Sequence, residues 1–338
     1  MAEDNFPFVK EVFGQSFDQP EGGVIPEHIE RANACFDALV HDMNRITDCL
    51  LNGRPADLGD LSRHVETVIE LLREDERYLL GLTQAPLDCL EKKFEPIPHP
   101  MTVWHGIGSM IFTLHISISL TLPADQLTGI GLAAVLGHLG LLQKPIQSNG
   151  DPITMFKEVQ SICGQLTPEI LKTLSLSDSD RPCMSAATKI CQFKYTIQEQ
   201  SSLHDANYQH AMIINVCDVF FFLCRFRSGD KEYSPTDVLK FMRSEMRNFF
   251  HPDIIKLFFN KLSIYPLGTF VLLKSSEIAK VVGINENFLL RPIILIVLDS
   301  EREEKLPFQR VDLRRNPYLY IRGPMRDDGL TEKYLDIF

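Results

Sequence analysis

The sequence predicts a mainly α-helical protein that ends in a small β unit. Apolar residues recur at helical spacing over most of 26–262, and short β-branched runs appear only after residue 264. Three prolines between Glu95 and Pro100 separate an N-terminal helical pair from the helices that follow. The expected divisions are an irregular arm over 1–25, an N-terminal helical segment over 26–97, a helical domain over 98–263, a β unit over 264–300 and a charged tail over 301–338.

The N-terminal segment is expected to form two antiparallel helices. Pro26 suits a first helical turn, because its missing N–H would have no partner there. Apolar residues then recur every three or four positions over 29–50, and Asn52 and Gly53 end that stripe. A second stripe over 61–79 predicts the partner helix. The first stripe is equally suited to a dimer interface.

Helical patterns continue through the middle of the chain before its character changes. Runs rich in Val, Ile and Leu then predict strands, and Tyr318–Ile321 is one strand-like piece in the charged tail. The expected helices lie at 101–122, 125–142, 153–175, 184–200, 208–227, 235–247 and 252–262, and the expected strands at 269–273, 278–283 and 292–298.

Composition limits the partners and the location of the chain. The net charge of −11 repels phosphate backbones and anionic lipid, so we expect neither nucleic-acid binding nor membrane insertion. No Cys-x-x-Cys pair occurs among the eight cysteines, which predicts reduced thiols in a cytoplasmic protein. The apolar stretch 107–122 is interrupted by Ser and His and is short for a membrane span.

Three segments together resemble the bacterial HD-GYP phosphohydrolase domain of the HD superfamily. Leu132–Leu142 resembles the helix end Ala-Ala-Leu-Leu-His-Asp-Ile-Gly-Lys, and Ile213–Leu223 resembles the later helix Ile-Ile-x-Val-Ala-Asp-Val-Tyr-Asp-Ala-Leu. Phe250–Leu273, followed by an Arg-Pro pair at Arg291, is similar to the ending of HD-GYP domains. The resemblance covers 70–300 and implies a helical HD-domain bundle.

The resemblance also implies a bi- or trinuclear metal site that hydrolyses cyclic di-GMP. Such metals polarise the phosphodiester and lower the pKa of a bridging water, and they require many His and carboxylate ligands. The first family His falls on His105 and the late Asp on Asp218. The His-Asp pair, however, falls on Gly137 and His138, and glycine has no side chain to bind a metal.

The remaining family ligands have no counterpart in this sequence. The Lys that follows the His-Asp pair is replaced by Leu141. The His-His-Glu run falls near Gln192, Phe193 and Lys194, and no His occurs between 139 and 203. The sequence therefore predicts no catalytic residue, no metal and no cofactor.

Two interpretations of the retained residues stay open. In the first, His105 and His138 are remnants that hydrogen-bond to each other or to Asp218. In the second, His105, His138, His210 and Asp218 hold a single divalent ion, Fe, Mn, Zn or Ni, for metal-dependent phosphodiesterase-like hydrolysis.

We expect a pseudoenzyme that takes part in cyclic di-GMP signalling through protein–protein interaction. The resemblance implies partners such as GGDEF-type or other signalling proteins, with a homodimer as an alternative. The charged tail, in which Tyr318 and Tyr320 lie among Arg residues, is a candidate docking element. Alternatively the old pocket senses a cyclic di-nucleotide without cutting it, and the cations nearby would be Lys189, Lys194 and Arg225.

Overall fold

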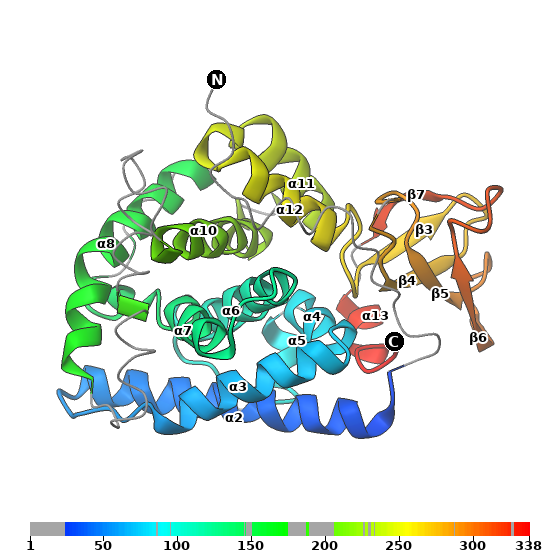
Figure 1. The fold of residues 1–338 in the computed structure, drawn as a ribbon. Coiled ribbons are helices and arrows are strands. Elements are labelled where there is room, and N and C mark those ends of the chain that lie inside the picture. The colour runs from blue at the N-terminus through cyan, green and yellow to red at the C-terminus, as the bar shows by residue number, and fades with distance from the viewer. Residues whose placement is uncertain are drawn as a thin grey trace.

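The computed structural model shows a helical body with a five-stranded sheet at one end (Figure 1). This architecture confirms the predicted fold class. The expected N-terminal arm lies almost entirely outside the described residues, as does nearly all of the expected helix 184–200. The structure describes residues 24–85, 87–94, 96–144, 146, 151–174, 187–188, 206–225, 227–228, 231–232, 234–286, 288–325 and 328–338.

The N-terminal helices lie side by side along one face of the body (Figure 1). They are α2 (Pro26–Leu51) and α3 (Gly59–Glu74), and each buries the apolar stripe expected for it. The second stripe, however, does not continue as one helix. It breaks at Asp75 and resumes as α4 (Arg77–Gln84).

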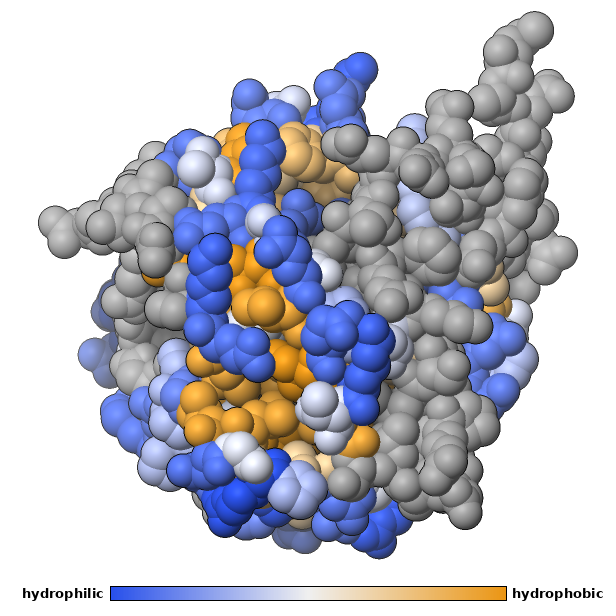
Figure 2. Space-filling view, turned by 90° about the vertical axis from the view of Figure 1, so that its left-hand side faces the viewer, coloured by the Kyte–Doolittle hydropathy of each residue, from blue (hydrophilic) through white to orange (hydrophobic). Residues whose placement is uncertain are grey.

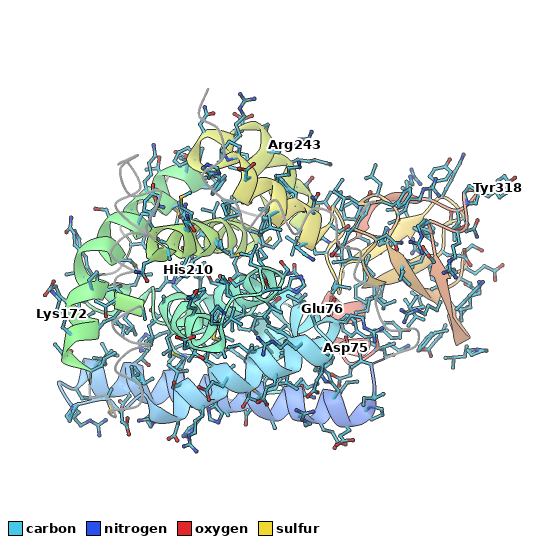
Figure 3. The ribbon with its side chains drawn as sticks, in the orientation of Figure 1. Asp75, Glu76, Lys172, His210, Arg243 and Tyr318 are labelled. Atoms are coloured by element: carbon cyan, nitrogen blue, oxygen red, sulfur yellow. The ribbon has the colours of Figure 1, made fainter. Side chains whose placement is uncertain are left out.

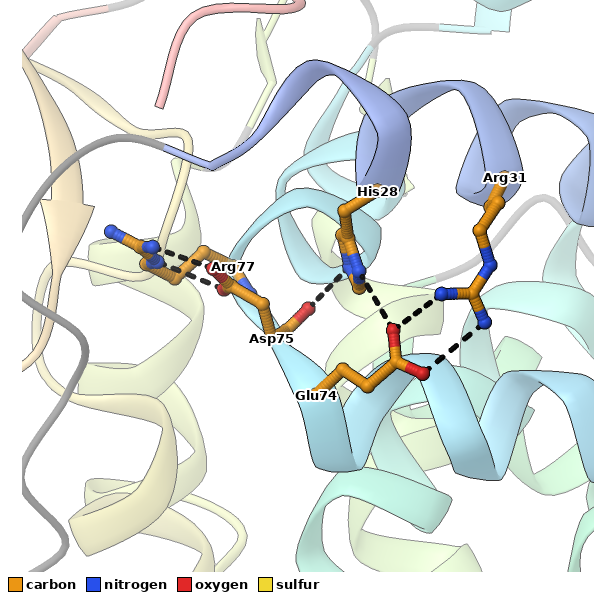
Figure 4. A network of polar contacts seen from close by, with 5 residues as sticks. All are labelled: His28, Arg31, Glu74, Asp75 and Arg77. Carbon is orange, nitrogen blue, oxygen red and sulfur yellow. Dashed lines mark hydrogen bonds and ion pairs between the residues drawn. The ribbon is translucent and has the colours of Figure 1, made fainter.

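A polar network around Asp75 explains this break (Figure 4). The Asp75 carboxylate accepts hydrogen bonds from the backbone N–H of Arg77 at 3.1 Å and from its Nε at 2.8 Å. His28 of α2 donates to the Asp75 carbonyl at 2.9 Å, and Arg31 pairs with Glu74 at 2.7 Å. The helix break thus fastens α2 to the junction between α3 and α4.

The helical body surrounds two buried helices, α6 (Val103–Ile118) and α10 (Ala206–Arg225). α6 contacts α2, α3, α4, α7, α10 and α12, so it is the central element of the described helices. The remaining helical elements are α5 (Leu87–Glu91), α7 (Ala124–Val135), η1 (Leu139–Leu142), α8 (Pro152–Thr173), α11 (Pro235–Ser244), η3 (Arg247–Phe249) and α12 (Pro252–Leu262), with a short hairpin of β1 (Arg227–Ser228) and β2 (Lys231–Glu232).

The stretch from Ala124 to Leu142 is long and apolar enough to cross a membrane by length and composition. In the fold, 83% of its most apolar window is buried, as in the core helix of a soluble protein.

The β unit is one antiparallel sheet with strand order β6-β5-β4-β3-β7. Three of its strands match the predicted runs. The residues of the expected charged tail 301–338 supply both edge strands of the sheet and a short helix. The polar side chains of β6 suit a sheet edge exposed to solvent. The elements are β3 (Phe270–Leu273), β4 (Ile278–Gly283), β5 (Ile293–Leu298), β6 (Glu304–Asp312), β7 (Ile321–Met325) and α13 (Asp328–Lys333).

The C-terminal residues join the β unit to the helical body. Lys280 of β4 is buried and donates hydrogen bonds to the carbonyls of Tyr334, Leu335 and Ile337 at 2.8–3.1 Å. Burial lowers the pKa of Lys280 well below its ordinary value. Phe338 packs edge-on against Tyr78 of α4, and buried apolar residues from Val24 to Phe338 form one cluster.

His115, near the end of α6, is a half-buried histidine whose surroundings disfavour the protonated imidazole. Its Nε2 is buried and has no hydrogen-bond partner among the described residues. Burial, together with the nearby Lys261 ammonium, lowers the pKa of His115 to about 4. Lys261 itself pairs with Glu286 at 2.7 Å.

Acidification is expected to destabilise the fold through His115. The folded-state pKa lies below the ordinary value of 6.5, so protonation favours the unfolded chain as pH falls from 6.5 to about 4. The free energy of unfolding should fall by up to about 3 kcal/mol over this pH range. His115→Gln should abolish most of this pH dependence. Urea unfolding at several pH values measures the free energy of unfolding. The variant His41→Gln, at an exposed histidine, is the control. Equal pH dependence of stability in the two variants would contradict the prediction.

Candidate functional site

His105, His138 and Asp218 meet in the interior of the helical body. His105 comes from α6, Asp218 from α10 and His138 from the turn between α7 and η1. The Asp218 Oδ1 atom lies 2.7 Å from Nε2 of His105 and 3.2 Å from Nε2 of His138. The imidazole rings lie edge to face with centroids 4.3 Å apart, and all three residues are at most 1% exposed.

Two glycines on α6 allow this convergence. A Cβ atom on Gly106 would lie 2.3 Å from the carbonyl oxygen of Val135, so glycine permits α6 to approach the end of α7. A Cβ atom on Gly108 would lie 1.8 Å from the ring of Phe221 on α10. Since carbon atoms do not approach so closely, larger residues at either position would separate the elements that carry the three side chains.

The turn that carries His138 is held by one hydroxyl of α8. Thr167 Oγ1 donates to the carbonyl of Gly137 at 3.1 Å and accepts from the N–H of Gly140 at 3.0 Å. Thr167 is completely buried. These two hydrogen bonds of Thr167 explain why the expected helix 125–142 ends early and continues as a 3₁₀ turn, with His138 directed inward.

Aromatic side chains surround the polar group. The His105 ring packs against Phe221 and Phe222 of α10, with centroid distances of 5.5 Å and 6.2 Å. Trp104 of α6 packs against the same Phe221 ring. Hydrogen bonds in such an apolar setting are electrostatically stronger than in water, and loss of one partner is correspondingly costly.

His210 does not belong to this group. It lies on α10, is 6% exposed, and stands eight residues before Asp218 (Figure 3). Eight residues share a helix face but lie about 12 Å apart along the axis. Among the described residues, His105, His138 and Asp218 form the group whose ligand atoms lie within 4.8 Å of one another. The expected four-residue cluster is therefore reduced to three.

The expected nucleotide contacts cannot be placed. Lys189 and Lys194 lie outside the described residues, as do Gln192 and Phe193. Arg225 ends α10, and its side chain is also outside the described part.

A groove lies elsewhere, between the end of α2, η1 and α8. Leu50, Leu51, Leu142 and Ile170 contribute apolar surface to it, and Arg54 and Glu169 contribute charge. Figure 2 shows the face that carries α8, where apolar side chains gather among polar ones. None of the three buried site residues lines this groove.

The three ligands that meet among the described residues do not fit the two-metal centre that the HD-GYP resemblance implies. Three ligands cannot complete the four to six positions that each of two ions requires. One ion is compatible with the spacing, because ligands at roughly 2.1 Å from an ion lie about 3 Å apart when they are adjacent. The same distances also suit direct hydrogen bonds.

Comparison with known proteins gives two partial matches. Residues 270–332 match the family described as KOW domain associated with HD domain. A stretch of 100 residues, 30% of this chain, is 28% identical to the cyclic di-GMP phosphodiesterase PA4108 of Pseudomonas aeruginosa. The matched stretch spans 24% of that protein's length, and no solved structure matches the chain. Both matches support a relationship to proteins that contain HD domains.

Proposed function

We propose that this chain is a non-catalytic, HD-GYP-like signalling or scaffold protein of the cytoplasm that acts by binding protein partners. The supporting observation is the buried group His105–His138–Asp218, in which one carboxylate oxygen is shared by two imidazoles. At most 1% exposed, these side chains have little access to a solvent-borne substrate.

The pattern of lost residues supports the same proposal. Three features that the resemblance implies are missing from the sequence. Gly137 and the absence of His between 139 and 203 leave no bridging ligand in the His-Asp pair and no His-His-Glu run. Leu141 stands where the resemblance implies a cation beside the pair. The retained helices still pack as a complete core around the former ligands. Conservation of the core without the ligand set favours a function of the surface over chemistry in the interior.

The convergence of three ligand atoms favours one alternative, a mononuclear metal site. Two imidazoles and one carboxylate form a donor set found for divalent Fe and, in other geometries, for Zn. A bound ion there would polarise a phosphoryl oxygen and activate water. In that case His105, His138 and Asp218 would hold it, and the hydrogen bond between His105 and Asp218 would be replaced by coordination.

Metal analysis separates the two functions. We expect the purified chain to contain far less than one equivalent of Fe, Mn, Zn or Ni, to show no hydrolysis of cyclic di-GMP with added Mn²⁺, and to keep its Tm when treated with EDTA. One equivalent of metal that is lost in both His105→Ala and His138→Ala, but kept in the exposed variant His41→Ala, would establish the mononuclear site instead.

Asp218→Asn tests the structural role of the buried group. Removing a buried charge partner should lower the free energy of unfolding by roughly 3 kcal/mol. Asp60→Asn provides the control, because this Asp is 52% exposed and, within the described part of the chain, pairs with Arg63 on the same helix. That exposed pair should contribute below about 1 kcal/mol. Equal effects of the two substitutions in urea unfolding would contradict a structural role.

Partner binding is testable separately by affinity purification from the source cells. We expect the wild-type chain to retain one or more signalling proteins reproducibly, since the proposal places its function on the surface. Recovery of chaperones alone would contradict the scaffold function.

A further inference from the structure

We propose that the turn between β6 and β7 is the docking surface, and that its ligand is an acidic segment of a partner protein. We call residues 313–320 the Arg/Tyr turn; its cationic and aromatic side chains are Arg314, Arg315, Tyr318 and Tyr320. This inference rests on the proposed function and specifies the partner chemistry. The turn lies at the outer end of the β unit, far from Lys172, His210 and Arg243 (Figure 3).

One guanidinium shapes the Arg/Tyr turn from within. Arg291 donates from Nη1 toward the carbonyls of Leu313, Asn316 and Leu319 at 3.1–3.2 Å. Leu313 is completely buried, so the turn is also anchored by an apolar side chain. A turn held at three carbonyls needs little ordering on binding, which reduces the entropic cost of docking.

Asp312 organises the base of the turn. Its carboxylate accepts from Asn285 Nδ2 and from the backbone N–H of Arg314, both at 2.9 Å. The guanidiniums of Arg314 and Arg315 lie 3.2 Å and 3.5 Å from the same carboxylate, and their side chains are 44% and 72% exposed. Exposed ion pairs of this kind contribute little, so both guanidiniums can turn toward a partner's carboxylates at low cost.

The aromatic residues of the turn are presented outward. Tyr318 is 92% exposed and Tyr320 is 42% exposed, whereas Leu319 between them packs on the core. Lys274 of the β3–β4 turn lies with its Nζ 5.0 Å from the Tyr320 ring centre. Tyr and Arg side chains on a rigid frame are the residue types that dominate binding energy at protein interfaces.

The charge distribution along β6 favours a short acidic ligand. Residues 305–322 carry five Arg and Lys and one Asp, although the whole chain has a net charge of −11. At the opposite end of β6, residues 299–304 carry four carboxylates, Asp299, Glu301, Glu303 and Glu304, and one cation, Arg302. The nine-residue strand β6 spans about 30 Å. A longer polyanion such as a nucleic acid, bound along β6, would extend from the basic end to the acidic end and be repelled by these carboxylates. A short acidic segment meets only the basic end.

Side chains, and not strand addition, would make this contact. β6 and β7 are the two edges of the sheet, and they carry Pro307 and Pro324. Proline has no backbone N–H, so it interrupts the donor row that an added strand would use.

Fluorescence anisotropy with a defined probe tests the proposal on the full chain. The probe is a labelled peptide of about six alternating Glu and Leu residues, which spans about 20 Å when extended and is therefore shorter than β6. We expect micromolar binding that weakens as salt is added. Arg314→Glu combined with Arg315→Glu should weaken binding at least about tenfold, and Tyr318→Ala should weaken it severalfold without lowering Tm, because its side chain is exposed.

Matched controls make the outcome decisive. Arg243→Glu changes an exposed arginine on α11 and should leave binding unchanged. Equal binding by the wild type and the Arg314/Arg315 variant, or no binding by either, would overturn the proposal. Tighter binding of a single-stranded oligonucleotide of equal charge, lost in the same variant, would also overturn it. If affinity purification recovers the same partners with that variant, this docking site fails while the scaffold function stands.

Discussion

Close packing of α6 against α7 and α10 is the constraint on which the rest of the structure depends. Gly106 and Gly108 allow main chain and aromatic ring to approach α6 at distances that no Cβ atom would permit. This packing buries the polar group of His105, His138 and Asp218 and makes α6 the element around which the other described helices assemble. These three polar side chains are thereby part of the core.

The buried polar group and the exposed β unit suggest a division of roles. In the interior, Asp218 accepts a hydrogen bond from His105 and lies 3.2 Å from His138, which is less costly than an isolated buried polar group. The exposed chemistry of the Arg/Tyr turn lies at the far end of the sheet, and Lys280 fixes that sheet to the helices through the C-terminal carbonyls. Under this proposal, partner binding and core stability are governed by different residues.

Sequence periodicity predicted the helices and three of the strands because local burial dictates the spacing of apolar residues. It missed β6 and placed a strand-like piece at 318–321, just before β7, since an edge strand with charged side chains and proline lacks the apolar alternation of an interior strand. It also joined α3 to α4, because the polar contacts of Asp75 that break the helix come partly from His28, far away in the chain.

The sequence by itself determined which polar residues implied by the HD-GYP resemblance have no counterpart, because Gly137 and Leu141 have no polar side chain in any fold. Only the tertiary structure decided which retained residues meet. The two hydrogen bonds of Thr167 hold the turn that places His138 beside Asp218. His210 stays outside the group because two helical turns separate His210 from Asp218. The Arg/Tyr turn likewise depends on Arg291 reaching carbonyls more than twenty residues away, a contact that residue spacing does not encode.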